Sequence, residues 1–389
     1  MKRDTATSLV EKIMSAFARR TGLYPESEHP RRYLWTDAFA VCNFLELQER
    51  TGNVRYLELA LSLVEQVHHT LGRHRRDDGR SGWLSGLGEE EGEAHPTAGG
   101  LRIGKAMPER RISEPYDERR EWDQDGQYYH YLTKWMHALN RVSRTTGRMI
   151  YNRWAVEMAA TVHARFTYSP RPGALKRMYW KMSIDLSHPL VPSMGHHDPL
   201  DGLVTYLELQ AAAANADGSR AVLEAEIAEM TSLCEGQDWS TGDPLGMGGL
   251  LCDAYRVAQL TVHGRYDRSR LLEAMTDGSI RSMEAFARRN LFMLSADYRL
   301  AFRELGLSIG LRALAKLKQL LEDNPDPFGP GNSLTARVKA LGRYTPLADT
   351  IERFWLDPTH QQAATWLEHE DINTVMLATS LAPDGFLAH

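Results

Sequence analysis

Two segments of this sequence share one pattern, in which a helix ends at a glycine turn and leads directly into another helix. Thr51-Gly52-x3-Tyr56-x3-Ala60 returns later as Thr146-Gly147-x3-Tyr151-x3-Ala155, and weaker versions occur at Asp217-Gly218 and His263-Gly264. The flanking apolar residues recur with the helical period, and glycine readily adopts the left-handed conformation that ends a helix. Repetition of helix, short turn and helix predicts stacked helical hairpins, and therefore an all-α protein.

The composition is that of a globular protein with a sizeable core. The chain has 389 residues, of which 42% are hydrophobic and 25% are charged, and a chain of this length can fold as one unit. We therefore predict a single domain over residues 1–389. The formal net charge of −5 argues against a dedicated nucleic-acid-binding protein, because such proteins need a basic surface.

The sequence contains no segment that we expect to cross a membrane. No run of about 18 apolar residues occurs, and residues 1–20 have the pattern of a charged helix rather than that of a signal peptide. We therefore expect a cytoplasmic protein. Cys42, Cys234 and Cys252 lie in apolar helical patterns without metal-ligand spacing, which predicts buried, reduced thiols.

Two long segments, at about 73–121 and 168–197, separate the predicted hairpins and are rich in glycine, charged residues and aromatic residues. Loops of this length are usually functional when a compact domain keeps them. Each short turn joins the two helices of a hairpin at one face of the assembly. The long segments and the starts of the first helices are therefore expected to share the opposite face.

The starts of these first helices combine carboxylates with aromatic or histidine side chains. An Asp at such a position is explained by helix capping, but capping needs no Trp or His beside it. Aromatic faces stack on sugar rings, and carboxylates bind hydroxyl groups or transfer protons, so we predict a saccharide substrate. The five starts are Trp35-Thr36-Asp37, Trp122-Asp123-Gln124-Asp125-Gly126, His196-His197-Asp198-Pro199, Trp239-Ser240-Thr241-Gly242-Asp243-Pro244 and Ala296-Asp297-Tyr298-Arg299.

This arrangement resembles the six-hairpin, or (α/α)6 toroid, superfamily, which includes six-hairpin glycosidases, unsaturated glucuronyl hydrolases and the N-acylglucosamine and cellobiose 2-epimerases. The resemblance covers about five hairpins between Trp35 and Asp323, a less regular segment from Pro346 to Leu381 that would supply the sixth, and the N-terminal helix. Trp35-x-Asp37-x-Phe39 is similar to a Trp-x-Asp segment on an inner helix of the unsaturated glucuronyl hydrolases. The resemblance implies a toroid whose inner helices point their N-terminal ends into a saccharide-binding funnel. No epimerase signature is found, which leaves the reaction type open.

Carboxylates are the first candidates for catalysis in such a funnel. A glycosidase needs one protonated carboxyl group and one ionised carboxylate, and Asp37, Asp123 and Asp125 are the leading candidates for these roles. Asp198 and Asp243 follow as substrate ligands. The expected platforms for stacking on a sugar ring are Trp35, Trp83, Trp122, Tyr128 and Tyr179.

Histidines allow two other interpretations. His196 and His197 could hold a metal ion together with Asp198 and Asp201, but adjacent residues of an extended segment point in opposite directions, so we expect no metal. A histidine base, with His197 as the candidate, could instead abstract a proton next to a sugar carbonyl, as the 2-epimerases do. His130 and His196 are expected to bind the substrate.

Four cationic residues lie at or near the same expected face. Their side chains could recognise a carboxylate or phosphate on a substrate, although solvated surface charge is the default interpretation of each. They are Arg32, Arg102, Lys105 and Lys181.

The favoured prediction is a glycoside hydrolase that uses paired carboxylates, with a saccharide as its partner and no cofactor. A sugar 2-epimerase or isomerase with a histidine base is the alternative among enzymes. A non-catalytic glycan-binding or scaffold protein stays open as well, because a fold does not dictate a chemistry.

Overall fold

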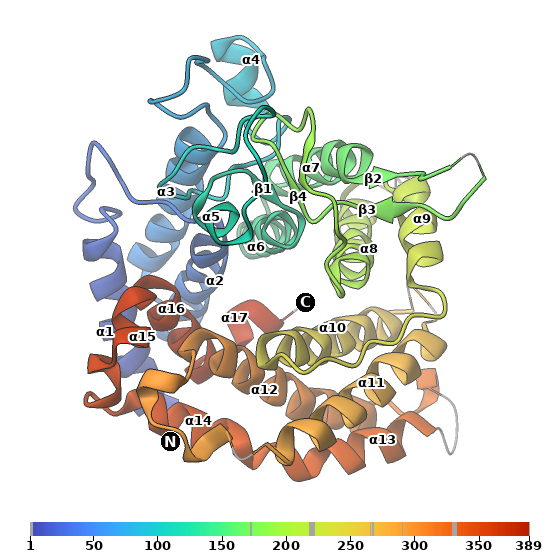
Figure 1. Ribbon diagram of the computed structural model, residues 1–389. Coiled ribbons are helices and arrows are strands. Elements are labelled where there is room, and N and C mark those ends of the chain that lie inside the picture. The colour runs from blue at the N-terminus through green and yellow to red at the C-terminus, as the bar shows by residue number, and fades with distance from the viewer. Residues whose placement is uncertain are drawn as a thin grey trace. The chain divides into compact units, whose positions relative to one another are not determined.

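The computed structural model describes residues 3–171, 173–217, 222–264, 266, 268–289, 291–328 and 333–388. Almost all regular structure in these residues is helical, which confirms the all-α prediction (Figure 1). The chain divides into two compact units, one formed by Ala18–Glu235 and the other by Met1–Phe17 with Gly236–His389. Helix α1 (Arg3–Arg20) contains residues that are assigned to each unit. The single domain over residues 1–389 stays a prediction.

The Ala18–Glu235 unit contains three helical hairpins, which confirms the predicted succession of helix, turn and helix. In each pair the second helix packs against the first, and α6 also packs against α2 and α8. The pairs are α2 (Leu34–Thr51) with α3 (Val54–Leu71), α6 (Tyr129–Thr146) with α7 (Ile150–Phe166), and α8 (Asp198–Asp217) with α9 (Glu224–Cys234).

The two repeated glycines end α2 and α6 as predicted. Gly52 and Gly147 have φ angles of 69° and 70°, in the left-handed region that other residues rarely adopt. The Gly52 N–H donates to the Gln48 carbonyl at 2.8 Å and so satisfies a free carbonyl in the last turn of the helix. Gly264 has the same conformation after α10, with a φ of 67°, whereas Gly218 lies outside the described residues.

Burial distinguishes the inner helices of this unit from the outer ones. Every residue of α2 from Leu34 to Leu47 and every residue of α6 from Leu132 to Ser143 is buried. Helix α3 buries only one face, along Tyr56, Leu59, Ala60, Leu63, Val64 and Val67. A helix buried all round lies inside a unit, and an amphipathic one covers it, so α2 and α6 form the interior to which α3 is added.

The two long segments carry short strands and helices. Strand β1 (Gln127–Tyr128) pairs with β4 (Lys181–Met182), which pairs with β5 (Pro189–Val191), and all neighbours are antiparallel. A separate hairpin joins β2 (Thr167–Tyr168) to β3 (Arg177–Met178). The helices of the first segment are α4 (Glu89–Ala94) and α5 (Glu118–Asp123).

The expected helix start at residues 122–126 is wrong, because a short strand, β1, lies between this stretch and the next helix. Trp122 and Asp123 end α5, and α6 begins only at Tyr129. Between them, Tyr128 pairs with Lys181 across the β1–β4 ladder. A Cβ at Gly126 would lie 2.8 Å from the Lys181 Cε and from the Met182 carbonyl oxygen, so glycine permits this close approach.

The other unit is built around α10 and α12, whose backbones meet through glycines. A Cβ at Gly248 would lie 2.0 Å from the Gly306 carbonyl oxygen. The expected helix start at Ala296 is instead a short 3-10 turn, and α12 begins at Ala301. The helices of this unit after α1 are α10 (Pro244–Val262), α11 (Ser269–Ala287), α12 (Ala301–Asp323), α13 (Ser333–Leu341), α14 (Pro346–Leu356), α15 (Ala364–Glu368), α16 (Glu370–Leu381) and α17 (Asp384–Leu387).

Two properties of the described residues bear on function. None of their helices is both long enough and apolar enough to span a membrane. Nor do they bring together three or more His, Cys, Asp or Glu side chains in a way that could hold a metal ion.

Candidate active site

Three helix starts of the Ala18–Glu235 unit bring together Trp35, His130 and Asp198. Each residue is the first or second of its helix, in α2, α6 and α8 respectively. The rings of Trp35 and His130 meet edge to face with their centroids 6.0 Å apart. The His130 Nδ1 lies 3.7 Å from the Asp198 Oδ1. The three were all predicted to bind substrate, and the structure places them side by side.

Each of these side chains has a buried polar atom without a hydrogen-bond partner in the described part of the chain. The atoms are the Trp35 Nε1, the His130 Nδ1 and the Asp198 Oδ2. The separation of 3.7 Å between His130 and Asp198 is too long for a hydrogen bond. An unsatisfied buried polar atom costs about 1–3 kcal/mol. Three such atoms on adjoining side chains are therefore expected to meet a polar ligand.

Asp198 has the chemistry of an acid that is still protonated near neutral pH. The residue is only 5% exposed. Burial, and after it the negative charge of Asp201, raise the pKa of Asp198 to about 7, although the Lys134 ammonium opposes the shift. A Cβ at Gly195 would lie 2.3 Å from the Asp198 Oδ2, so the absence of a side chain there lets the preceding loop close over the carboxyl group.

Asp201 lies one helical turn beyond Asp198 and is held in a different way. Its carboxylate accepts hydrogen bonds from the Lys134 Nζ and from the Thr133 Oγ1, both at 2.5 Å. These two donors come from α6 and stabilise the ionised form. One carboxylate on α8 is thus paired with a cation, whereas the neighbouring Asp198 has a buried Oδ2 without a hydrogen-bond partner in the described part of the chain.

His130 complements Asp198, because its imidazole stays neutral at a pH at which an ordinary histidine begins to take up a proton. Burial is the main cause that lowers its pKa to about 4, and the charge of Lys134 adds to it against the opposing charge of Asp201. About a quarter of the side chain is nevertheless exposed, at 26%. A neutral imidazole that a ligand can reach can accept a proton.

Aromatic side chains surround this pair. The His130 ring is nearly parallel to Tyr128 at 5.4 Å and to Trp180 at 6.2 Å. The same ring meets Tyr131 edge to face at 4.9 Å, and the Tyr131 and Tyr33 hydroxyls are 2.7 Å apart. Burial raises the pKa of Tyr128, so this phenol stays neutral. The result is an aromatic site with hydroxyl groups at its edge.

Trp122 joins the site through Trp180. The two indoles meet edge to face at 5.2 Å, and Trp122 is 46% exposed. An exposed indole beside a partly buried one offers an apolar surface on which a ring of a ligand can stack.

The three carboxylates that were the leading catalytic candidates have other surroundings. Asp37 is buried and accepts the Tyr33 N–H at 2.9 Å and the Arg32 Nη1 at 3.3 Å, so it stabilises the first turn of α2. Asp123 is exposed at the end of α5. Asp125 is completely buried and lies between α5 and β1.

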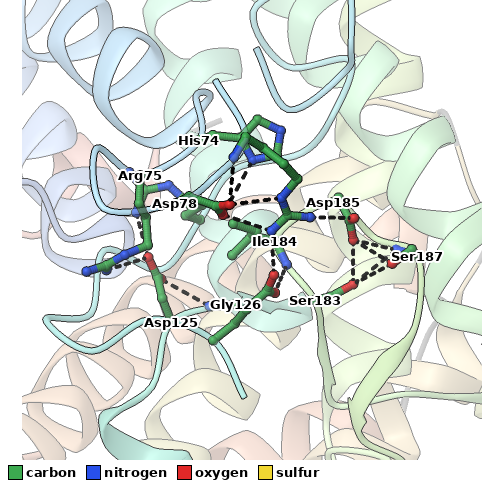
Figure 2. A network of polar contacts seen from close by, with 12 residues as sticks. His74, Arg75, Asp78, Asp125, Gly126, Ser183, Ile184, Asp185 and Ser187 are labelled. Carbon is green, nitrogen blue, oxygen red and sulfur yellow. Dashed lines mark hydrogen bonds and ion pairs between the residues drawn. The ribbon is translucent and has the colours of Figure 1, made fainter. Parts of the chain in front are cut away.

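Asp125 accepts hydrogen bonds from several N–H groups. Figure 2 shows two of them, the Arg75 Nη1 at 3.4 Å and the backbone N–H of Gly126 at 3.1 Å. The Arg102 Nη1 donates at 2.5 Å, and the backbone N–H groups of Gly104 and Lys105 donate at 3.0 and 3.3 Å. This carboxylate ties the loop at residues 102–105 to the strand that precedes α6.

A polar network next to Asp125 holds the two long segments together (Figure 2). The Arg80 guanidinium donates to Asp78 at 2.8 Å and to both Glu109 and Asp185 at 2.7 Å. Burial alone would raise the pKa of Asp185, but hydrogen bonds from Ser187 and Ser183 bring it down to about 2. The network anchors the turn after β4, and β4 follows Trp180.

The predicted histidine pair lies just before α8. The two rings are 4.6 Å apart, with His196 exposed and His197 partly buried. The His197 carbonyl accepts the Asp201 N–H at 2.9 Å, in the first turn of the helix.

The remaining predicted residues take part in other contacts. Trp83 is buried under the Arg73 guanidinium, which lies 4.2 Å from its ring centroid. Tyr179 stacks on Tyr168 at 4.2 Å beside the β2–β3 hairpin. Asp243 belongs to the other unit, where it caps α10 and pairs with Arg303 at 2.8 Å.

The interpretation of the four cations as solvated surface charges is wrong for three of them. Arg32 and Arg102 are buried and donate to Asp37 and to Asp125 respectively. The Lys181 Nζ is buried against the Glu121 carboxylate and the Glu121 and Gln124 carbonyls, all at 2.8 Å, and burial lowers its pKa. Lys105 alone of the four is partly exposed.

The sequence-based prediction did not include Trp180, Tyr33, Tyr131 or Lys134 among the site residues. Trp180 had a usable signal, because residues 179 and 181 of an extended segment face away from residue 180, so Tyr179 and Trp180 could not both face the site. The contact between Tyr33 and Tyr131 has no such signal, since it depends on the packing of α2 against α6.

No protein-family model matches the sequence, and no curated protein matches it either. The chain is similar in structure to the GH76A alpha-1,6-mannanase from Salegentibacter sp. HEL1_6, at 13% identity and a TM-score of 0.48, over 97% of this chain and 99% of that one. It is also similar to the cellobiose 2-epimerase from Spirochaeta thermophila, at 11% identity and a TM-score of 0.45, over 88% and 98%. The corresponding enzyme from Bacillus thermoamylovorans gives 10% identity and a TM-score of 0.43, over 81% and 76%.

Proposed function

We propose that this protein is a carbohydrate-active enzyme that works by acid–base catalysis, with His130 and Asp198 as the proton-transferring pair. The observation that carries the proposal is a buried carboxyl group with a pKa of about 7 beside a partly exposed imidazole with a pKa of about 4. Near neutral pH such a pair holds a proton on the carboxyl group and a free lone pair on the imidazole.

A sugar suits the surroundings of this pair. Its ring has apolar faces and polar edges, and the site offers the rings of Trp180 and Trp122 together with the hydroxyls of Tyr33 and Tyr131. A sugar hydroxyl would also satisfy the Trp35 N–H, which has no partner in the described part of the chain. A site built to bind hydroxyl groups rejects apolar molecules, because its own polar atoms would stay unpaired.

The short separation of the pair favours isomerisation or epimerisation at the carbon next to a sugar carbonyl. In this reaction the His130 imidazole takes the proton from that carbon, and the C–H electron pair forms the double bond of an enediol. The carbonyl π electrons move to oxygen, which takes the Asp198 proton. Return of a proton to carbon and loss of the hydroxyl proton complete the reaction. A base and an acid 3.7 Å apart can serve two adjacent carbon centres of one sugar.

Glycoside hydrolysis is the second candidate, and the raised pKa of Asp198 favours it. A carboxyl group that stays protonated near pH 7 can donate its proton to a glycosidic oxygen. Retaining and inverting hydrolases separate their two carboxyl groups by about 5–5.5 Å and about 6.5–9.5 Å respectively. His130 is not a carboxylate, so a hydrolase of either kind would need a second carboxyl group as the partner of Asp198.

The experiment that separates the candidates is incubation with free aldoses and with disaccharides in D2O, followed by proton NMR. An epimerase gives a new sugar that carries solvent deuterium on the carbon next to the carbonyl, whereas an isomerase places the deuterium on the former carbonyl carbon. In either case His130→Gln abolishes both the new sugar and the deuterium. A hydrolase gives new reducing ends without carbon-bound deuterium. His95→Gln is the matched control, because His95 is an exposed histidine paired with Glu157. Saccharide binding without turnover would leave the non-catalytic glycan-binding protein.

A further inference from the structure

Lys105 is a cation at the edge of the candidate site, and its ammonium has no carboxylate within ion-pair distance in the described part of the chain. Its backbone is fixed, because the Lys105 N–H donates to the Asp125 carboxylate at 3.3 Å. Its Nζ lies 5.5 Å from the centroid of the Tyr33 ring. The Tyr33 hydroxyl in turn contacts the hydroxyl of Tyr131, the neighbour of His130. The ammonium is thus held beside Tyr33, which forms with Tyr131 and Trp180 the aromatic wall that would receive a sugar.

Two buried carboxylates, one that accepts the Lys105 N–H and one that pairs with the neighbouring Lys181, are already neutralised by other cations. Asp125 pairs with Arg102 and Arg75. Glu121 pairs with Lys181 at 2.8 Å and with Arg110 at 2.9 Å. The charge of Lys105 is close enough to contribute, after burial, to the lowered pKa of Lys181. The Lys105 ammonium therefore has no ion-pair partner among these carboxylates, and an anionic ligand can supply one.

We infer that the site takes an anionic saccharide, whose carboxylate or phosphate is bound by Lys105 while the sugar ring stacks on the aromatic wall. This inference rests on the proposed function, since it names the substrate class of the same site. An ammonium next to an aromatic face is partly desolvated, and its interaction with an anion is then stronger than at an open surface. A uronate and a sugar phosphate share this chemistry, and their different shapes allow a direct comparison.

The test is direct binding, so that it does not depend on turnover. Glucuronate, glucose 6-phosphate and glucose are each titrated calorimetrically into the wild type, Lys105→Gln and Lys105→Arg. Lys339→Gln serves as the matched control, because Lys339 is an exposed lysine in the other unit. A charge-assisted hydrogen bond contributes about 1.5–3 kcal/mol, so Lys105→Gln should weaken binding of at least one anionic probe by about tenfold or more. Lys105→Arg should retain most of the affinity, and glucose should bind both variants as it binds the wild type.

The salt dependence gives a second measure. Raising the NaCl concentration from about 0.05 M to about 0.5 M should weaken binding of the anionic probe in the wild type and much less in Lys105→Gln, because salt screens a partly exposed charge. The probe that loses more affinity in Lys105→Gln identifies the anion as carboxylate or phosphate. Equal affinity of the wild type and Lys105→Gln for both anions, with glucose bound normally, would overturn the inference and leave the proposed function standing. Failure of all three probes to bind would count against the saccharide site itself.

Discussion

Asp125 and Asp198 are both buried carboxylates next to the start of an inner helix, yet their surroundings are opposite. Asp125 is 0% exposed and accepts N–H groups from two arginines and three backbone positions. Asp198 is 5% exposed, has an unpaired Oδ2 and lies 3.7 Å from a neutral histidine. Burial alone therefore does not mark a functional carboxylate. The supply of donors decides whether the group is a structural anion or an acid that can give up its proton.

The largest effect that we expect is the loss of turnover in Asp198→Asn. A positioned general acid contributes about 10²–10⁴-fold to a rate, and the amide keeps the shape of the side chain but cannot donate the same proton. The measurement is kcat on the substrate identified by NMR, together with its pH profile. In the wild type, kcat should fall as the pH rises through about 7, because Asp198 then loses its proton. A variant with full activity and the same pH profile would remove Asp198 from the mechanism.

The equivalent change at the other carboxylate should affect folding. Asp125→Ala leaves Arg102 buried without its partner, and breaking a buried ion pair in this way costs about 3–5 kcal/mol. We expect a correspondingly lower free energy of unfolding in urea denaturation. Asp125→Asn should cost less, since an amide oxygen can still accept hydrogen bonds. Loss of turnover without loss of stability would contradict the structural role of Asp125 and return it to the catalytic candidates.

Substitution at the two positions should also change stability in opposite directions: Asp125→Ala lowers the free energy of unfolding, whereas Asp198→Asn raises it above neutral pH. The pKa of Asp198 in the folded protein is above its ordinary value, so the folded state binds more protons than the unfolded state between about pH 4 and 7. The free energy of unfolding therefore falls across this range, and the loss is complete above it. Asp198→Asn removes this term. The free energy of unfolding of the variant minus that of the wild type should therefore increase by up to about 3 kcal/mol between pH 5 and pH 8.

Thermal unfolding of both proteins from pH 5 to pH 8 measures this difference. His130 also titrates, and its lowered pKa makes stability rise with pH between about 4 and 6.5. The term from His130 is present in the wild type and in Asp198→Asn, so the difference between them isolates Asp198. A difference that stays constant with pH would show that Asp198 is ionised like an ordinary aspartate.

The features that the sequence predicts well are those that a few neighbouring residues determine. Gly52 and Gly147 end helices because glycine accepts their φ angles of 69° and 70°, and no distant contact is needed. The start of α6 could not be placed in this way. Tyr128 pairs with Lys181, which is far away in the chain, and this pairing overrides the local preference of residues 122–126 for a helix.

For the same reason, the sequence identifies several residues of the site but does not predict the role of each. Trp35 and Asp198 can be selected from the sequence, because they stand at predicted helix starts with the residue types that bind sugars, and His130 is selected as a histidine expected to bind the substrate. Their roles depend on partners that come from elsewhere. Arg75 and Arg102 reach Asp125 from the first long segment, while no equivalent cation reaches the Asp198 Oδ2 among the described residues. The spacing of residues along the chain contains no information on which aspartate receives the donors.

The smallest effect should come from Asp123, the third carboxylate of the sequence-based prediction. It is exposed at the end of α5, so water solvates its charge. We expect Asp123→Asn to change the free energy of unfolding by no more than about 0.5 kcal/mol and to leave kcat within about twofold of the wild type, since far less than a general acid's contribution is at stake. Urea denaturation and the NMR assay measure both quantities.

Because the same Asp→Asn substitution is made at three aspartates, differences in side-chain shape cancel. The order of the effects, Asp198, Asp125 and then Asp123, therefore tests only the surroundings of each carboxylate. A large loss of turnover in Asp123→Asn would mean that an exposed carboxylate beside Trp122 reaches the substrate, which would revive the paired-carboxylate hydrolase with Asp123 opposite Asp198.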